Sequence, residues 1–246
     1  MKVQISNLIL ELTRKCNMNC CHCLRGNAQN KSMSKDIIIK SLTTFDYIST
    51  LTLSGGEITL AKPQLDDVGF TMQFYNQVNV DSVYMVTNGK SMLPGIGDSI
   101  ERIIRYCGSN EISQIQISED SFHDKAKALG KWLDWGEYMQ ANYPLTNHFV
   151  SRKKCESYHV IDMGRGWGKP LESKYKGFEF ESYSEDILCI TEGDLYINVK
   201  GDILPVCDLS YKAQEKYKLG NIMDLSAEEI VEILKNYKAP EIYENV

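Results

Sequence analysis

Short apolar runs alternate along the first two-thirds of the chain with longer segments in which apolar residues recur every three or four positions. The short runs predict buried strands, and the longer segments predict helices with one apolar face. The predicted strands are Asn7–Leu12, Thr50–Leu53, Ser82–Val86, Ile112–Ile117, Asn147–Val150 and His159–Met163. Helices are predicted after Ser34, over residues 63–78, around Ile100–Ile104 and from His123 to Tyr143.

Strands that alternate with helices form parallel sheets, in which each crossover has the same right-handed sense. Five or six strand–helix units fit before this pattern ends, whereas an eight-unit barrel would leave too little chain for the remainder. We therefore expect an α/β protein built as a partial (β/α)6 TIM-like barrel.

The last quarter of the chain has a different pattern. Residues 164–186 are rich in glycine and charge and are interpreted as a connecting segment. Two apolar runs around a turn at 200–202 predict a β-hairpin, and Ser226 is placed to cap a final amphipathic helix. The predicted organisation is a barrel domain over residues 1–185 and a small hairpin-plus-helix subdomain over residues 186–246.

Composition narrows the class of partner. The 246 residues include 27 Lys and Arg against 33 Asp and Glu, a net charge of −6, which argues against nucleic acid as the main partner. No apolar run approaches the roughly 20 residues of a membrane helix, and the first residues lack a signal-peptide core. We expect a cytoplasmic protein that does not bind a membrane.

Four of the eight cysteines fall within residues 16–23, directly after the first predicted strand. In a reducing compartment such a cluster indicates a metal or redox site rather than disulfides. Cys16, Cys20 and Cys23 have the spacing Cys-x3-Cys-x2-Cys, and three thiolates can bind three irons of a [4Fe-4S] cluster while the fourth iron stays open. A structural zinc site would need a fourth ligand, which His22 could supply only by straining the loop. A zinc knuckle and unliganded thiols stay open as alternatives.

The segment from Glu11 to Cys23 resembles the signature loop of the radical S-adenosylmethionine (radical SAM) enzymes. The resemblance implies a [4Fe-4S] cluster on Cys16, Cys20 and Cys23, with SAM bound to the open iron. It also implies that the ring of His22 packs near the adenine. Cys21 is an extra thiol that does not correspond to a family ligand.

Two short motifs at the ends of the next strands fit the same family. Gly55, Gly56 and Glu57 are similar to the family motif that holds the methionyl amino group of SAM, although Gly-Gly-Glu alone is most often a turn. Thr87 and Asn88, followed by a glycine, match a tract that lines the SAM pocket and are equally consistent with a simple turn.

The later strand ends give weaker signals. Ser118 and Asp120 resemble the Ser-x-Asp segment that bonds the ribose hydroxyls in many family members, and a helix cap is the alternative. Arg152 could pair with the SAM carboxylate, and a solvated surface arginine is the simpler interpretation.

The C-terminal segment resembles the SPASM or twitch extension of this family, which usually carries auxiliary iron–sulfur clusters. Cys189 and Cys207 belong to this pattern, but the gap from Gly201 to Cys207 is one residue too long and no cysteine follows. A second cluster would have to borrow Cys155, Cys107 or Asp208. We expect instead a cluster-free remnant that caps the barrel, in which Cys155, Cys189 and Cys207 are packed thiols, a pair or a hydrogen-atom donor.

The resemblance implies an enzyme that reductively cleaves SAM to a 5′-deoxyadenosyl radical, which abstracts hydrogen from a substrate. The C-terminal extension favours a peptide or protein substrate, as in maturases, and the low-potential cluster implies a flavodoxin or ferredoxin as electron donor. A nucleotide or small metabolite as substrate and an activase of a glycyl-radical enzyme are alternatives within the family. A non-catalytic zinc or iron–sulfur module is the alternative from another class.

Overall fold

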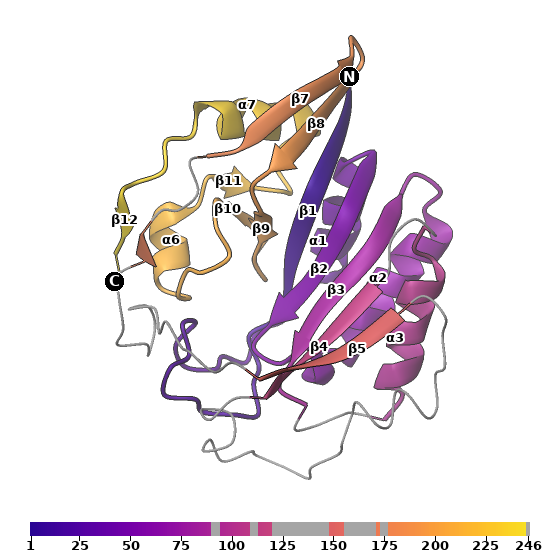
Figure 1. Ribbon diagram of the computed structural model, residues 1–246, viewed down its shortest axis with the longest axis vertical. Coiled ribbons are helices and arrows are strands. Elements are labelled where there is room, and N and C mark those ends of the chain that lie inside the picture. Colours follow the sequence, from indigo (N-terminus) through magenta and orange to yellow (C-terminus); the bar gives the residue numbers. More distant parts are fainter. Residues whose placement is uncertain (90–93, 109–112, 120–147, 155–170, 173–176, 245–246) are drawn as a thin grey trace.

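The computed structural model describes residues 1–89, 94–108, 113–119, 148–154, 171–172 and 177–244 (Figure 1). The predicted helix from His123 to Tyr143 and the predicted strand His159–Met163 lie outside these residues. No helix in the described ranges is long and apolar enough to cross a membrane.

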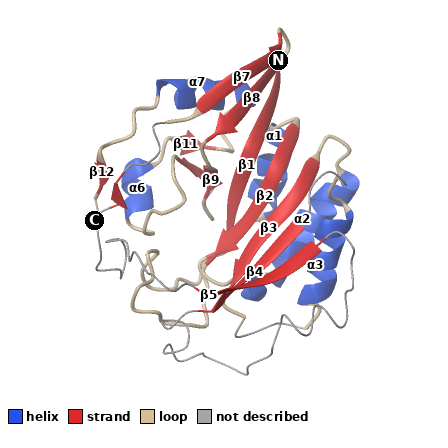
Figure 2. Cartoon of the chain, viewed as in Figure 1, coloured by secondary structure: helices blue, strands red, loops and turns tan. Residues whose placement is uncertain are grey.

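Five strands form the parallel centre of the main sheet, and they lie side by side in chain order. They are β1 (Lys2–Thr13), β2 (Tyr47–Gly55), β3 (Val80–Thr87), β4 (Ser113–Glu119) and β5 (His148–Lys154). The helices α1 (Lys35–Thr44), α2 (Lys62–Phe74) and α3 (Ile96–Arg105) cover one face of this sheet (Figure 2). The predicted α/β class and partial barrel are confirmed.

Local signals explain where the elements begin. The hydroxyl of Ser34 accepts a hydrogen bond from the Ile37 amide and so caps α1. Pro63 lies in the first turn of α2, where its missing N–H costs nothing. The last helix, α7 (Ala227–Asn236), begins with a capping box in which Ser226 and Glu229 bond each other's backbone amides.

Alternation along the strands separates the helix-covered face from the open face. Leu8 and Leu10 of β1, with Leu51 and Leu53 opposite them on β2, belong to the main apolar core. The intervening residues point to the other face, because successive side chains of a strand alternate. On that face polar residues follow one another across the strands, namely Thr52, Ser54, Tyr84, Gln114, Gln116 and Ser118.

The C-terminal strands extend the same sheet beyond β1. The strand β8 (Ile187–Glu192) pairs in parallel with Lys2–Ile5 of β1, and β9 (Leu195–Ile197) pairs in parallel with Leu8–Leu10. β9 and β10 (Asp202–Leu204) form the predicted antiparallel hairpin. The remaining short elements are η1 (Ile58–Leu60), β6 (Leu171–Glu172), α6 (Ala213–Tyr217), β11 (Gly220–Asn221) and β12 (Ile242–Tyr243). The boundary between residues 185 and 186 stays a prediction.

The interpretation of residues 164–186 as only a connection is wrong. The strand β7 (Glu179–Ser184) lies within them and pairs antiparallel with β8. β7 is an edge strand whose side chains are almost all exposed, and only Phe180 contacts the core. Its polar sequence therefore lacks the apolar alternation from which a strand is predicted.

Candidate functional site

A cavity of about 300 Å³ lies at the carboxyl ends of β1 to β4. The loop that follows β1 supplies half of its wall, and the residues that end β2, β3 and β4 supply the rest. Its lining residues are Cys16, Met18, Cys20, His22, Cys23, Leu24, Arg25, Ser54, Gly55, Gly56, Glu57, Val86, Thr87, Asn88 and Ser118. Ligands of parallel α/β sheets bind at this edge, because the strand-to-helix loops meet there.

The structure brings together residues that the sequence singled out separately. The three predicted cluster cysteines line the cavity, and so does every predicted SAM contact whose side chain is described. Asp120 lies outside the described residues. Arg152 lies on β5, paired with Ile117 of β4, and its side chain is outside the described part.

The candidate metal donors of the cavity are thiols. Cys16, Cys20 and Cys23 form no disulfide within the described part of the chain, and Cys21 is exposed and does not line the cavity. Among the same residues, no three His, Cys, Asp or Glu side chains are arranged to hold one metal ion. A [4Fe-4S] cluster does not require such convergence, since each thiolate binds a different iron.

Backbone hydrogen bonds shape the cysteine loop, here defined as residues 14–31. The amide of Cys23 donates to the carbonyl of Cys20 (3.2 Å), and the amide of Gly26 donates to the carbonyl of Cys23 (3.1 Å). The Met18 amide donates to the sulfur of Cys16 at 3.4 Å. These hydrogen bonds hold the loop backbone around the three cysteines.

The two glycines after β2 are needed for a close approach of backbone to backbone. A Cβ on Gly55 would lie 2.5 Å from the Thr13 carbonyl oxygen, and one on Gly56 would lie 2.4 Å from the Lys15 carbonyl oxygen. The amides of Gly56 and Glu57 donate to these same carbonyls, at 2.7 and 2.8 Å. The Gly-Gly pair therefore fixes the chain immediately before Cys16.

Glu57 joins the end of β2 to the end of β3. The side chain is 2% exposed. Its Oε1 accepts hydrogen bonds from the Thr59 amide, the Thr59 hydroxyl and the Thr87 hydroxyl. Its Oε2 accepts one from the Asn88 amide at 2.8 Å, which leaves acceptor capacity on the oxygen of a cavity-lining carboxylate.

A pair of buried carboxamides connects β3 to the cysteine loop. The Asn88 Nδ2 donates to the Asn17 Oδ1 at 2.9 Å. The Asn17 Nδ2 is buried and has no hydrogen-bond partner among the described residues. Gly89 follows with a φ of +66°, the left-handed conformation expected of the turn.

Sequence reasoning missed five residues of the wall, namely Met18, Leu24, Arg25, Ser54 and Val86. Arg25 is the only arginine or lysine among the described lining residues. Its position two residues after Cys23 was the available signal, because a residue so close to the cluster motif must lie near the same cavity. Val86 is 38% exposed, which is unusual for a strand valine and follows from its place on the cavity wall.

The remaining cysteines are not gathered at one place. Cys189 is paired in register with Gln4 near the start of β1, whereas Cys207 packs against a second apolar cluster that includes Ile9 and Leu204. Burial, together with the Asp208 carboxylate, raises the pKa of the Cys207 thiol to about 12. Cys155 lies outside the described residues.

The fold of this chain is similar to that of solved protein structures. The chain matches the structure of anSMEcpe, a radical SAM enzyme, with bound AdoMet and Cp18Cys peptide, at a TM-score of 0.57 and 11% identity over 94% of this chain and 83% of that chain. It matches polyhistidine-tagged anSMEcpe with bound AdoMet at a TM-score of 0.56 and 14% identity, over 94% and 81% of the two chains. No family model matches the sequence, and no curated protein matches it. The chain has the radical SAM fold.

Proposed function

We propose that this protein is a radical SAM enzyme that acts on a peptide or protein. The observation that carries the proposal is the meeting, in one cavity, of three thiols with the residues that end β2, β3 and β4. The motifs lie far apart in the sequence, and chance matches would have no reason to line the same cavity.

Each part of the wall has a role in this proposal. Cys16, Cys20 and Cys23 hold a [4Fe-4S] cluster, and the free acceptor capacity of Glu57 Oε2 receives the ammonium group of SAM. When bound, the cluster and SAM would supply a reductive cleavage that takes one electron from the proposed flavodoxin or ferredoxin, releases methionine and gives a 5′-deoxyadenosyl radical able to abstract hydrogen from a substrate carbon. In this proposal the Ser118 hydroxyl bonds the ribose and the His22 ring packs near the adenine, and both residues line the cavity.

Part of the cavity wall is apolar. Met18 is 3% exposed, and Leu24 and Val86 also line the cavity. Once a bound substrate closes the cavity, such a wall would limit side reactions of a radical and strengthen the electrostatic contacts of the bound molecules. The protein thus binds, orients and shields, and the cofactors carry the chemistry.

Two observations support a peptide as the substrate. The matched anSMEcpe structure contains a bound peptide beside AdoMet. In this chain the polar face of the sheet continues from Ser54 and Ser118 at the cavity to Tyr84 and Gln116, whose side chains are hydrogen-bonded at 2.8 Å. Hydroxyl and carboxamide groups can bond the amides and carbonyls of a peptide backbone. A flavodoxin or ferredoxin is the proposed electron donor.

The first experiment tests the cluster. The protein is reconstituted anaerobically with iron and sulfide, and 5′-deoxyadenosine is measured after addition of SAM and dithionite. Cys16→Ala, Cys20→Ala and Cys23→Ala should each abolish the product, and Cys21→Ala is the matched control that should retain it. Product formation by all three variants would refute the proposal, as would zinc bound without sulfide in the wild-type protein.

The second experiment tests the substrate. Candidate peptide substrates are prepared in perdeuterated form and incubated with the reconstituted enzyme. Transfer of deuterium into 5′-deoxyadenosine identifies the peptide as the hydrogen donor. Transfer from a deuterated nucleotide or metabolite, with none from the peptide, would contradict a peptide substrate and leave the cluster assignment intact.

A further inference from the structure

Two arginines flank the cluster motif. Arg14 lies two residues before Cys16 and Arg25 lies two residues after Cys23. Arg14 is 1% exposed, and Arg25 is half-buried in the cavity wall. Buried arginines are rare unless they are paired and hydrogen-bonded, so the partners of these two groups are informative.

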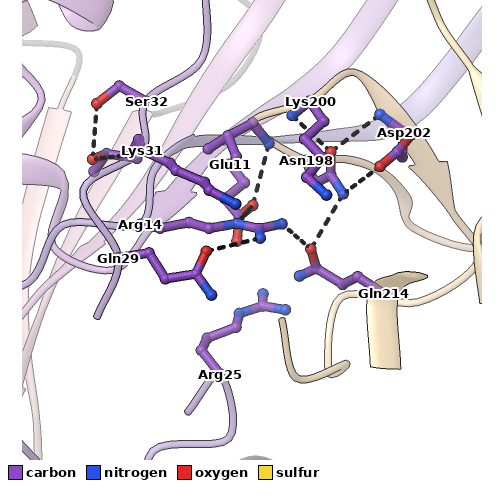
Figure 3. Close-up of polar contacts among 12 residues, drawn as sticks. Glu11, Arg14, Arg25, Gln29, Lys31, Ser32, Asn198, Lys200, Asp202 and Gln214 are labelled. Atoms are coloured by element: carbon purple, nitrogen blue, oxygen red, sulfur yellow. Dashed lines mark hydrogen bonds and ion pairs between the residues drawn. The ribbon is translucent and has the colours of Figure 1, made fainter. Parts of the chain in front are cut away.

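Arg14 connects β1 to a residue 200 positions later. Its Nε donates to the Glu11 Oε2 at 2.9 Å, and one of its terminal nitrogens donates to the Gln214 Oε1 (Figure 3). Its guanidinium carbon also lies 4.4 Å from the ring centre of Tyr211, a cation–π distance. Glu11 and Gln214 are both fully buried.

Arg25 makes the same kind of contact from the other end of the motif. It donates to the Leu209 carbonyl at 2.7 Å and lies 4.8 Å from the ring centre of Tyr196. Its own carbonyl accepts a hydrogen bond from the Tyr211 amide at 3.1 Å. Both arginines therefore bind residues 196–214, which include β10, most of β9 and the start of α6.

The receiving segment is itself tied together by side chains. Gln214 Oε1 also accepts from the Asn198 Nδ2 at 3.3 Å, and Asn198 Oδ1 accepts from the amides of Lys200 and Asp202 (Figure 3). Glu11 Oε2 accepts a second bond from the Val199 amide at 3.2 Å. The hairpin turn, α6 and the base of the cysteine loop thus share one buried network.

We propose that Arg14 and Arg25 are positioning residues through which residues 195–217 hold the cysteine loop in its cluster-binding geometry. The part that concerns the cluster rests on the proposed function. Three thiolates must be held at fixed separations by a loop with no regular secondary structure, and preorganised supporting contacts supply that precision. In this chain residues 195–217 would thus support the SAM-binding cluster by holding the cysteine loop in place.

A purely structural role makes a different prediction. If the arginines only attach residues 195–217 to the barrel, loss of their partners would lower the stability of the whole fold without loosening the cysteine loop more than other regions. Local opening can be separated from global unfolding by amide hydrogen exchange.

The test begins with metal-free protein. Gln214→Ala removes the acceptor of Arg14 without touching the cysteine loop, and Ser226→Ala, which removes the α7 cap, is the matched control in the C-terminal part of the chain. The amides of Arg14 and Gln29, each hydrogen-bonded across the base of the loop at 2.9 Å, should exchange about ten- to a hundredfold faster in Gln214→Ala. Ser226→Ala should leave them unchanged. Equal effects of the two variants, or none on these amides, would overturn the inference.

Reconstituted protein gives a second readout. Gln214→Ala should release iron to a chelator faster than wild type, and Gln214→Glu, which keeps an acceptor for Arg14, should restore the wild-type rate. If Gln214→Ala does not fold, Tyr211→Leu replaces it, with Tyr211→Phe as the control that keeps the ring under Arg14. Release rates that do not follow this order would refute the proposal. Failure of the wild-type protein to bind a cluster would refute the proposed function alone, because the exchange experiment uses no metal.

Discussion

Glu57→Gln is the most informative substitution in the binding site, because it keeps the shape of the side chain and replaces one charged acceptor oxygen with an NH2 group. Both carboxylate oxygens of Glu57 accept a bond from a backbone amide, Oε1 from Thr59 and Oε2 from Asn88. A glutamine has one oxygen and one NH2 group. Whichever way it is turned, its NH2 group faces one of these two N–H donors.

The magnitude follows from that geometry. The substitution loses at least one hydrogen bond to a charged acceptor in a fully buried site, worth about 1.5–3 kcal/mol, and leaves a buried N–H without a partner, at about 1–3 kcal/mol. Relaxation recovers part of this, so we expect a loss of about 3 kcal/mol. For a chain of this size that corresponds to a fall in Tm of roughly 6–12 °C.

The assay is thermal unfolding of metal-free protein, followed by circular dichroism, so that cofactor binding does not contribute. Glu192→Gln is the control, since it makes the same chemical change at an exposed position and should shift Tm by less than about 2 °C. A Tm for Glu57→Gln within that control range would show that the carboxylate does not hold the ends of β2 and β3 together.

Further predictions concern glycines and thiols. Gly56→Ala should destabilise the fold by several kcal/mol and lower the iron content after reconstitution, because its Cβ would overlap the Lys15 carbonyl. Gly69→Ala, within α2, should cost far less, because its Cβ would lie 3.1 Å from the flexible side chain of Arg102, which can move, and alanine favours the helix by up to about 1 kcal/mol; an equal loss in both would contradict this. Cys207, with its pKa raised to about 12, should resist alkylation at pH 8 while the exposed Cys21 reacts, as mass spectrometry of peptides would show. The neutral Cys207 thiol should also make stability fall from about pH 9 upward, where the unfolded thiol ionises but the folded one does not; the fall should be smaller in Cys207→Ser, in which Cys107 and Tyr211 still have raised pKa values.

The parallel half of the sheet could be predicted because its signals are local. Each of the strands β1 to β5 contains an apolar run that predicts it. Helices such as α1 and α7 begin directly after a residue that caps them. Strands β7 and β8 were not predicted, for two different reasons. The first is a polar edge strand, and the second, Ile187–Glu192, lies at the border of a segment interpreted as a connection.

The candidate site was predictable residue by residue only where a motif carried it. Cys16, Cys20, Cys23 and the Gly-Gly-Glu segment could be named from residue type and spacing. The sequence alone left the glycines as a SAM-binding motif or a simple turn, whereas the structure packs their Cα atoms against the carbonyls of Thr13 and Lys15. A motif identifies which residues belong together but leaves open which atoms they contact.

By itself, the sequence determined the class of fold, the cysteine motif and the strand ends at which a ligand would bind. These features depend on periodicity and spacing within about 20 residues, and such patterns are visible in one dimension. Only the tertiary structure decided that β8 and β9 both pair with β1. It also decided that Arg14 donates a hydrogen bond to Gln214 and Arg25 donates one to the Leu209 carbonyl. Contacts between residues nearly 200 positions apart depend on the tertiary fold. The partner of a buried charged side chain can therefore be identified only when that fold is known.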